Sequence, residues 1–272
     1  MDLYLGYHRK LYCAFVDYKK AFDTIWRVGL WRKMLKYDIN GKFLAIIRDM
    51  YAKTKSCIIK KEEVSEYFMC SVGVRQGENL SPLLFSIYLN DSEDFFRENG
   101  YNHSKFLENL SKQQEFFDNL GIFIKNFIMM YADDTIIIAD TPEELQKGLC
   151  CLYDYCQTWN LQVNSTKTKV MIFWRSDRFL KPVFTLGEDV IEIVNQYTYL
   201  GTIFAMNGNF SKERRRRLEQ ASKAMFLLLR RGRFLGLPQD MMLDLFDKLI
   251  VPIALYGCEV WGHESLEIIE KL

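Results

Sequence analysis

The spacing of hydrophobic positions changes twice along this chain, from strand-like to helical and back, before a purely helical C-terminal part. Apolar runs and two-residue alternation predict strands. They cover residues 11–17, 56–60, 67–74, 169–174, 183–186 and 197–204. Helical spacing predicts helices over residues 24–37, 41–52, a stretch from 81, a stretch from 142, 211–231 and 239–249. Strands therefore mix with helices up to about residue 205, and helices alone follow.

Capping signals locate the starts of three of these helices. Ser81-Pro82 predicts a start with Ser81 as the N-cap and proline in the first turn. Thr141 to Glu144 has the pattern of a capping box, followed by an apolar stripe of Leu145, Leu149, Leu152 and Cys156. Asp23 is predicted to cap the helix after it.

The order of these elements predicts an α+β fold in two domains, residues 1–205 and residues 206–272. A polar stretch over residues 100–119 is expected to be a variable connection. Of the 272 residues, 49% are hydrophobic and 15% aromatic, which indicates a packed globule. The formal net charge of +1 gives no global sign of a nucleic-acid partner, so any basic surface has to be local.

The cysteines and the N-terminal sequence indicate in which cellular compartment the protein is expected. Seven cysteines without CxxC spacing predict reduced, mostly buried thiols rather than a zinc site or a disulfide framework. No signal peptide and no membrane-spanning run is expected. These features predict an intracellular protein without a membrane partner.

Two acidic positions interrupt apolar segments where solvation alone explains no charge. Asp133-Asp134 lies between two apolar runs, as at the tip of a hairpin, and Asp17 ends the strand over 11–17. Mg²⁺ prefers oxygen ligands and is usually held by one or two carboxylates with substrate phosphates. Three carboxylates from neighbouring strands could hold two Mg²⁺ ions, or Mn²⁺, for phosphoryl transfer. The plainer alternative is that each acid is a turn or capping residue.

Five motifs occur in the order found in reverse transcriptases, and the set most resembles those of non-LTR, LINE-like retrotransposons. They are DYKKAFD (17–23), RQGENLSP (75–82), YADD (131–134), NSTKTKVM (164–171) and YLG (199–201). LYGCEVW (255–261) also resembles the end of the thumb in those elements. The resemblance implies a polymerase palm with an antiparallel sheet and packed helices over 1–205, and an α-helical thumb over 206–272.

The resemblance also implies a site and its substrates. Asp17, Asp133 and Asp134 would hold the metal ions, and Lys167 or Lys169 would act on the pyrophosphate, a choice that the sequence leaves open. Contacts with the deoxynucleoside triphosphate would come from Tyr18, Phe22 as the gate against a ribose 2′-hydroxyl, Arg75, Gln76 and Gly77. Contacts with the RNA template and DNA primer would come from Tyr131, Leu200, Gly201, Arg214 and Arg217.

Each assignment has a plainer alternative. Phe22 could be core, Gln76-Gly77 a turn, either lysine a strand-edge residue, and YLG an ordinary hairpin. The run from Arg214 to Arg217 could be a solvated helix surface, because consecutive helical residues point about 100° apart and cannot form one flat patch.

Asp17 comes sixteen positions after Met1, so the fingers region that precedes it in complete enzymes is expected to be missing. We therefore expect weak or no polymerase activity from the isolated chain. The alternative function is a truncated, inactive nucleic-acid-binding remnant. A metal-dependent nuclease is a third hypothesis, disfavoured because His8, His103 and His263 lie outside the motifs. Protein partners cannot be deduced.

Overall fold

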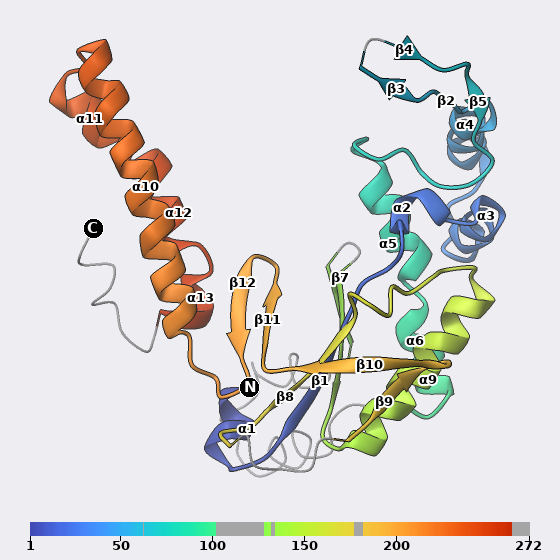
Figure 1. Cartoon of the computed structure of the whole chain (residues 1–272). Coiled ribbons are helices and arrows are strands. Elements are labelled where there is room, and N and C mark those ends of the chain that lie inside the picture. Colours follow the sequence, from blue (N-terminus) through green and yellow to red (C-terminus); the bar gives the residue numbers. More distant parts are fainter. Residues whose placement is uncertain (62, 102–127, 132–133, 177–181, 263–272) are drawn as a thin grey trace. The chain divides into compact units, whose positions relative to one another are not determined.

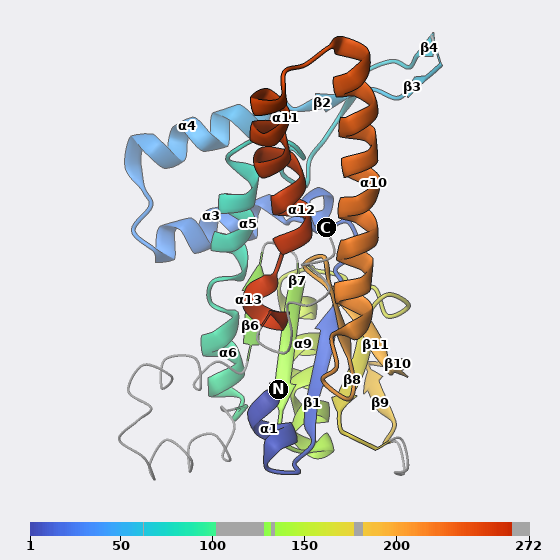
Figure 2. The same ribbon diagram turned by 90° about the vertical axis from the view of Figure 1, so that its left-hand side faces the viewer.

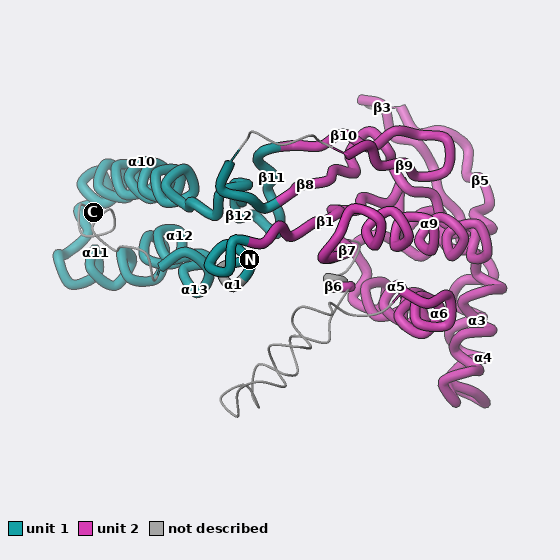
Figure 3. Tube along the Cα trace, turned by 90° about the horizontal axis from the view of Figure 1, so that it is seen from below, with its two compact units in different colours: residues 1–8, 173–177, 195–272 teal, residues 9–172, 178–194 magenta. Residues whose placement is uncertain are grey.

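A computed structural model describes residues 1–61, 63–101, 128–131, 134–176 and 182–262 of the chain. The chain divides into two compact units, residues 9–172 with 178–194 and residues 1–8 with 173–177 and 195–272 (Figure 3). We call the first the sheet unit and the second the helical unit. The predicted boundary at residues 205/206, and the palm and thumb roles on either side of it, stay predictions.

The sheet unit contains a six-stranded sheet in the order β6-β7-β1-β8-β10-β9 (Figure 1). Its strands are β1 (Leu11–Val16), β6 (Ile128–Tyr131), β7 (Asp134–Ala139), β8 (Lys169–Phe173), β9 (Phe184–Leu186) and β10 (Asp189–Val194). All six residues of β1 are buried, as expected for a strand with neighbours on both sides and continuous apolar sequence. The fold is α+β, as predicted.

The sheet is not purely antiparallel. β7 pairs antiparallel with β1 and β6, whereas β8 and β10 are parallel, with Ile193 opposite Val170. Strand β10 was not predicted from the hydrophobic pattern. β10 forms an antiparallel hairpin with β9. As the second strand of this hairpin, β10 lies next to β8 and runs parallel to it.

The helices of the sheet unit follow the apolar spacing closely. They are α2 (Ala21–Thr24), α3 (Arg27–Lys36), α4 (Gly41–Ala52), α5 (Ser81–Leu89), α6 (Ser92–Glu98) and α9 (Pro142–Thr158). α9 packs on β1, β7 and β9, and α6 packs on α9 (Figure 2). The predicted N-cap is confirmed, since the Thr141 side chain accepts a hydrogen bond of 3.2 Å from Glu144 N, whereas the Glu144 side chain accepts from Asp140 N, one residue before the cap. The predicted stripe from Leu145 to Cys156 is buried, as expected.

Two capping predictions are wrong. Asp23 lies within α2, and Trp26 is the N-cap of α3, because the chain makes an extended step between the two helices. Leu80 is the N-cap of α5. The Ser81 hydroxyl instead donates a 2.5 Å hydrogen bond to Arg75 O and so closes the loop before the helix.

The two strands predicted over 56–60 and 67–74 are four short pieces. They are β2 (Lys55–Ser56), β3 (Ile59–Lys60), β4 (Glu63–Val64) and β5 (Phe68–Met69), which pair as β2–β5 and β3–β4. Much of this ribbon is exposed, so no buried face demands longer strands there. The predicted connection over 100–119 falls almost wholly outside the described residues.

A buried lysine ties three helices of the sheet unit together. Lys33 of α3 is 1% exposed, and its ammonium lies 2.6 Å from Asp91 Oδ1, at the start of α6. It also donates to Tyr155 Oη of α9 at 2.7 Å and lies 3.6 Å from the ring centroid of Trp159. Polar groups can therefore be buried here because they satisfy one another.

The helical unit consists of a β-hairpin and a set of helices. Its elements are α1 (Asp2–Gly6), β11 (Gln196–Tyr199), β12 (Thr202–Ala205), α10 (Ser211–Leu235), α11 (Gln239–Leu245), the π-helical turn η2 (Phe246–Ile250), α12 (Val251–Leu255) and α13 (Cys258–Trp261). Ala221, Ile250 and Ala254 form a small core between α10, η2 and α12. No described helix is both long enough and apolar enough to cross a membrane.

Candidate active site

Asp17 directly follows the central strand β1, and its backbone is held on both sides. Its N–H donates to Thr168 Oγ1 at 3.1 Å, and its carbonyl accepts from Asn164 N at 2.7 Å. Its side chain is 33% exposed. The carboxylate therefore stands at the end of a buried strand with access to solvent.

Asp134 begins the strand that pairs with β1. Tyr131 opposes Asp134 where β6 and β7 pair. The β1–β7 ladder ends at the pair Val16–Thr135, so Asp17 and Asp134 are the next residues of these two strands. Two acids distant in sequence therefore lie at the same end of neighbouring strands.

The third predicted acid, Asp133, lies outside the described residues, as does Ala132. Among the residues that the structure describes, no group of three or more His, Cys, Asp or Glu side chains could hold a metal ion. Asp17 and Asp134 supply carboxylate oxygens, the donors that suit Mg²⁺. Tyr131 is placed by its backbone only, in β6.

The two candidate lysines have different surroundings. Lys167 Nζ lies 3.9 Å from Asp17 Oδ2, and its side chain is 69% exposed. Lys169 Nζ is bound 2.6 Å from Glu192 Oε2 and donates to Thr166 O at 2.6 Å. Lys167 therefore faces the acidic position, whereas Lys169 ties β8 to β10.

A pocket of about 460 Å³ adjoins Asp17 and carries three lysines. Its lining is Asp17, Tyr18, Lys19, Lys20, Thr24, Gln162, Asn164 and Lys167. Tyr18 is 7% exposed and packs edge-on against Phe85. Burial raises the pKa of the Tyr18 hydroxyl well above its usual range. Any contact of Tyr18 with a nucleotide would therefore come mainly from its backbone.

Phe22 lies beside the segment that carries Arg75, Gln76 and Gly77. Its ring packs on Phe85 of α5, with centroids 5.2 Å apart, and its carbonyl accepts from Val74 N at 2.7 Å. Gly77 has φ +91°, a conformation that a side chain disfavours, as the sequence predicted. Arg75 lies 2.7 Å from Glu78 Oε1 and donates to Met50 O at 2.9 Å.

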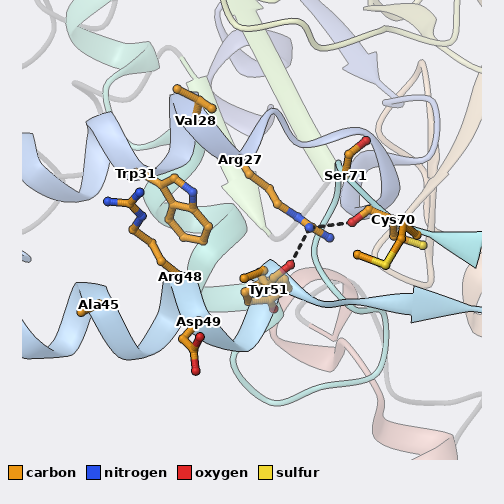
Figure 4. A pocket seen from close by; sticks show the side chains of 11 residues that line it. Arg27, Val28, Trp31, Ala45, Arg48, Asp49, Tyr51, Cys70 and Ser71 are labelled. Atoms are coloured by element: carbon orange, nitrogen blue, oxygen red, sulfur yellow. Dashed lines mark hydrogen bonds between the residues drawn. The ribbon is translucent and has the colours of Figure 1, made fainter.

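Arg27 is a site-supporting residue that the sequence analysis missed. Its guanidinium donates to four carbonyls at 2.7–3.1 Å, those of Tyr51, Cys70, Val72 and Gly73. It lines a pocket of about 620 Å³ together with Trp31, Arg48 and Asp49 (Figure 4). Gly73 allows its own backbone to pack closely against the backbone of Asp23, since a Cβ at residue 73 would lie 2.5 Å from Asp23 O. In the sequence Arg27 resembles any surface arginine at a helix start.

In the helical unit, Leu200 and Gly201 form the turn of the β11–β12 hairpin. Both have left-handed backbones, with φ of 44° and 74°, as the right-handed twist of a two-residue hairpin requires. The Leu200 carbonyl accepts from Tyr256 Oη at 2.9 Å, and the Gly201 carbonyl accepts from Arg216 and Arg217. The predicted hairpin at YLG is present, so the single strand predicted over 197–204 is wrong: it is two antiparallel strands that meet at this turn.

The arginine run is not a uniform basic surface. Arg214 and Arg217 are 9% and 8% exposed, whereas the Arg215 side chain is 81% exposed. Arg217 is bound to Glu213 at 2.6 Å and to the hairpin turn. The predicted phosphate contacts of Arg214 and Arg217 stay untested, but Arg217 has a structural role inside this unit.

Comparison with protein-family models finds a match to reverse transcriptase (RNA-dependent DNA polymerase) over residues 6–204. The chain belongs to this family, and the resemblance to the reverse transcriptases of non-LTR retrotransposons is confirmed.

Relatives are similar over nearly the whole chain. A probable RNA-directed DNA polymerase from transposon X-element of Drosophila melanogaster is 23% identical, covering 94% of this chain and 26% of the relative. An RNA-directed DNA polymerase from mobile element jockey of Drosophila funebris is 22% identical, covering 95% and 27%. The chain thus spans about a quarter of the length of these relatives.

Among solved structures, a telomerase from Candida tropicalis in complex with a TWJ fragment of telomeric RNA is 13% identical, with a TM-score of 0.49. It matches over 95% of this chain and 40% of its own.

Proposed function

We propose that this chain is the catalytic segment of an RNA-directed DNA polymerase of a non-LTR retrotransposon. It adds deoxynucleotides from their triphosphates to a DNA primer on an RNA template. The observation that supports the proposal is the β1–β7 pairing, which ends at Val16–Thr135, directly before Asp17 and Asp134 on the two strands, in a chain of the reverse transcriptase family.

Asp17 and Asp134, with Asp133 from the same hairpin, would hold two Mg²⁺ ions or Mn²⁺ ions. When bound, such ions lower the pKa of the attacking 3′-hydroxyl and offset charge on the transferred phosphate. Asp17 would be held in place as a metal ligand, because its own N–H and C=O are hydrogen-bonded at the end of a strand.

The residues around the acidic site would each have a separate role in catalysis or nucleotide binding. Lys167, rather than Lys169, would neutralise or protonate the departing pyrophosphate, since its ammonium lies 3.9 Å from Asp17 Oδ2, whereas that of Lys169 is bound to Glu192. Phe22 would contact the sugar and reject a 2′-hydroxyl. Arg75, Gln76 and Gly77 would contact the incoming nucleotide, on a loop whose path Arg27 maintains.

Nucleic acid would contact both units. Tyr131 lies next to the acidic hairpin tip, and Leu200 with Gly201 would position the primer end. Arg214 and Arg217 are the predicted phosphate contacts, although the exposure of Arg215 makes it the better placed arginine of the run.

Single-nucleotide extension tests the proposal. With poly(rA)/oligo(dT), dTTP and Mg²⁺, and protein in excess so that a slow step is detected, we expect addition of thymidylate that EDTA abolishes. Asp17→Asn is expected to slow addition by about 100-fold or more, since it removes a charged ligand of ions that catalysis requires. Asp38→Asn, the same change at a turn after α3, is the matched control and should retain the wild-type rate.

Mn²⁺ binding, followed by water-proton relaxation, provides a second measurement without catalysis. The wild type and Asp38→Asn should bind Mn²⁺ alike, and Asp17→Asn should bind at least 10-fold more weakly. A wild type that neither extends the primer nor binds Mn²⁺, or an Asp17→Asn variant with an unchanged rate and unchanged Mn²⁺ binding, would refute the proposed function.

A further inference from the structure

We infer that Glu213, Arg217 and Tyr256 are positioning residues that lock the turn of the β11–β12 hairpin in place, and so fix the primer terminus during nucleotide addition. The functional half of this inference rests on the proposed function. All three residues and the hairpin belong to the helical unit.

Glu213 is the centre of the lock. It lies in the first turn of α10 and is 0% exposed. One carboxylate oxygen accepts from Arg217 Nε at 2.6 Å and from Arg216 Nη2 at 2.9 Å, whereas the other accepts from Ile203 N of β12 at 2.9 Å. The helix alone could neutralise Glu213 with its two arginines. The bond to Ile203 joins the helix to the hairpin.

The arginines extend the same network to the tip of the hairpin. Both donate to the carbonyl of Gly201. In a hairpin that projects into solvent, the turn carbonyls would bind water. Here Arg217 connects the turn carbonyl to the buried carboxylate of Glu213 and thereby fixes the turn relative to α10.

Tyr256 binds the carbonyl of the other turn residue, Leu200, and comes from a different pair of helices. It lies between α12 and α13, and its hydroxyl donates to Leu200 O at 2.9 Å. The Arg217 guanidinium lies 4.4 Å from the centroid of the Tyr256 ring. The fully buried Trp261 donates to the Tyr256 carbonyl at 3.1 Å and anchors it in turn. The carbonyls of both turn residues are thus bound by side chains from separate elements.

A lock of this kind has a chemical purpose. An isolated two-stranded hairpin is marginally stable in water, and a buried ion pair adds little net stability because desolvation offsets the attraction. What it does provide is one defined geometry. Nucleotide addition requires this, because a displacement of about 1 Å between reacting groups can cost about 100-fold in rate.

Two conservative variants test the inference. Tyr256→Phe removes one hydrogen bond and keeps the ring beneath Arg217, and Glu213→Gln keeps the shape and removes the charge. Asp244→Asn, which breaks an exposed pair with Lys248 in the same unit, is the control for Glu213→Gln. Protection of the amides of residues 196–205 from hydrogen exchange is expected to fall at least 10-fold in both test variants and to stay unchanged in the control.

In the extension assay, kcat for correct addition is expected to fall about 10-fold in both test variants, while the Kd for primer–template stays within 2-fold of wild type. General unfolding would lower binding and rate together. Unchanged exchange in the hairpin of both variants overturns the lock, whatever the activity. Reduced protection with an unchanged kcat overturns its role in positioning. A wild type that neither extends the primer nor binds Mn²⁺ refutes the proposed function, and hydrogen exchange then still decides whether the lock exists.

Discussion

Replacement of Lys33 by methionine should destabilise the sheet unit far more than an ordinary surface substitution. Lys33 lies 2.6 Å from Asp91, with side-chain exposures of 1% and 9%. The variant would leave the Asp91 carboxylate buried, with a 2.8 Å hydrogen bond from Tyr155 and the more distant Lys36 at 3.8 Å. Removal of one partner from a buried ion pair costs about 3–5 kcal/mol. Because Lys36 offsets part of the charge, we expect about 3 kcal/mol.

Urea unfolding, followed by tryptophan fluorescence, measures this cost as a shift of the midpoint. Lys36→Met is the matched control, since it makes the same change one turn away at a side chain that is 57% exposed. Exposed pairs contribute about 0–1 kcal/mol. The double variant Lys33→Met with Asp91→Leu should recover most of the loss, because neither charge then remains buried. Equal costs for Lys33→Met and Lys36→Met would refute the reasoning.

Two further predictions concern pH and the loop before Gln76. Burial lowers the pKa of Lys33 to about 8 from its ordinary 10.5, so above pH 8 the unfolded chain binds more protons than the folded chain. The free energy of unfolding of the wild type relative to Lys33→Met should therefore rise between pH 7.5 and 9.5, and a flat or falling difference in urea titrations would contradict the assignment. Arg27→Lys should destabilise the sheet unit by about 2 kcal/mol or more, because one ammonium cannot reach four carbonyls that the guanidinium spans. It should also raise the KM for dTTP, with Arg32→Lys, on the next turn of α3, as the control in both assays.

Local signals in the sequence determined much of this protein. The continuous apolar run of β1, the bounds of α4, the Thr141 cap and the buried stripe of α9 all depend on residues within a few positions of one another. Five short motifs in order also determined the family, because each needs specific residue types at a fixed spacing.

Only the tertiary structure decided which distant residues meet. The pairing of β1 with β7 brought Asp17 and Asp134 to the same end of two neighbouring strands, the position of β10 made one pair of strands parallel, and the ion pair with Glu192 distinguished Lys169 from Lys167. Lys33, Glu213 and Arg27 look like surface charges in the sequence, yet the structure buries them with partners from other elements. The physical reason is that burial and pairing depend on what packs from elsewhere in the chain, and the local period of hydrophobic residues contains no information about it.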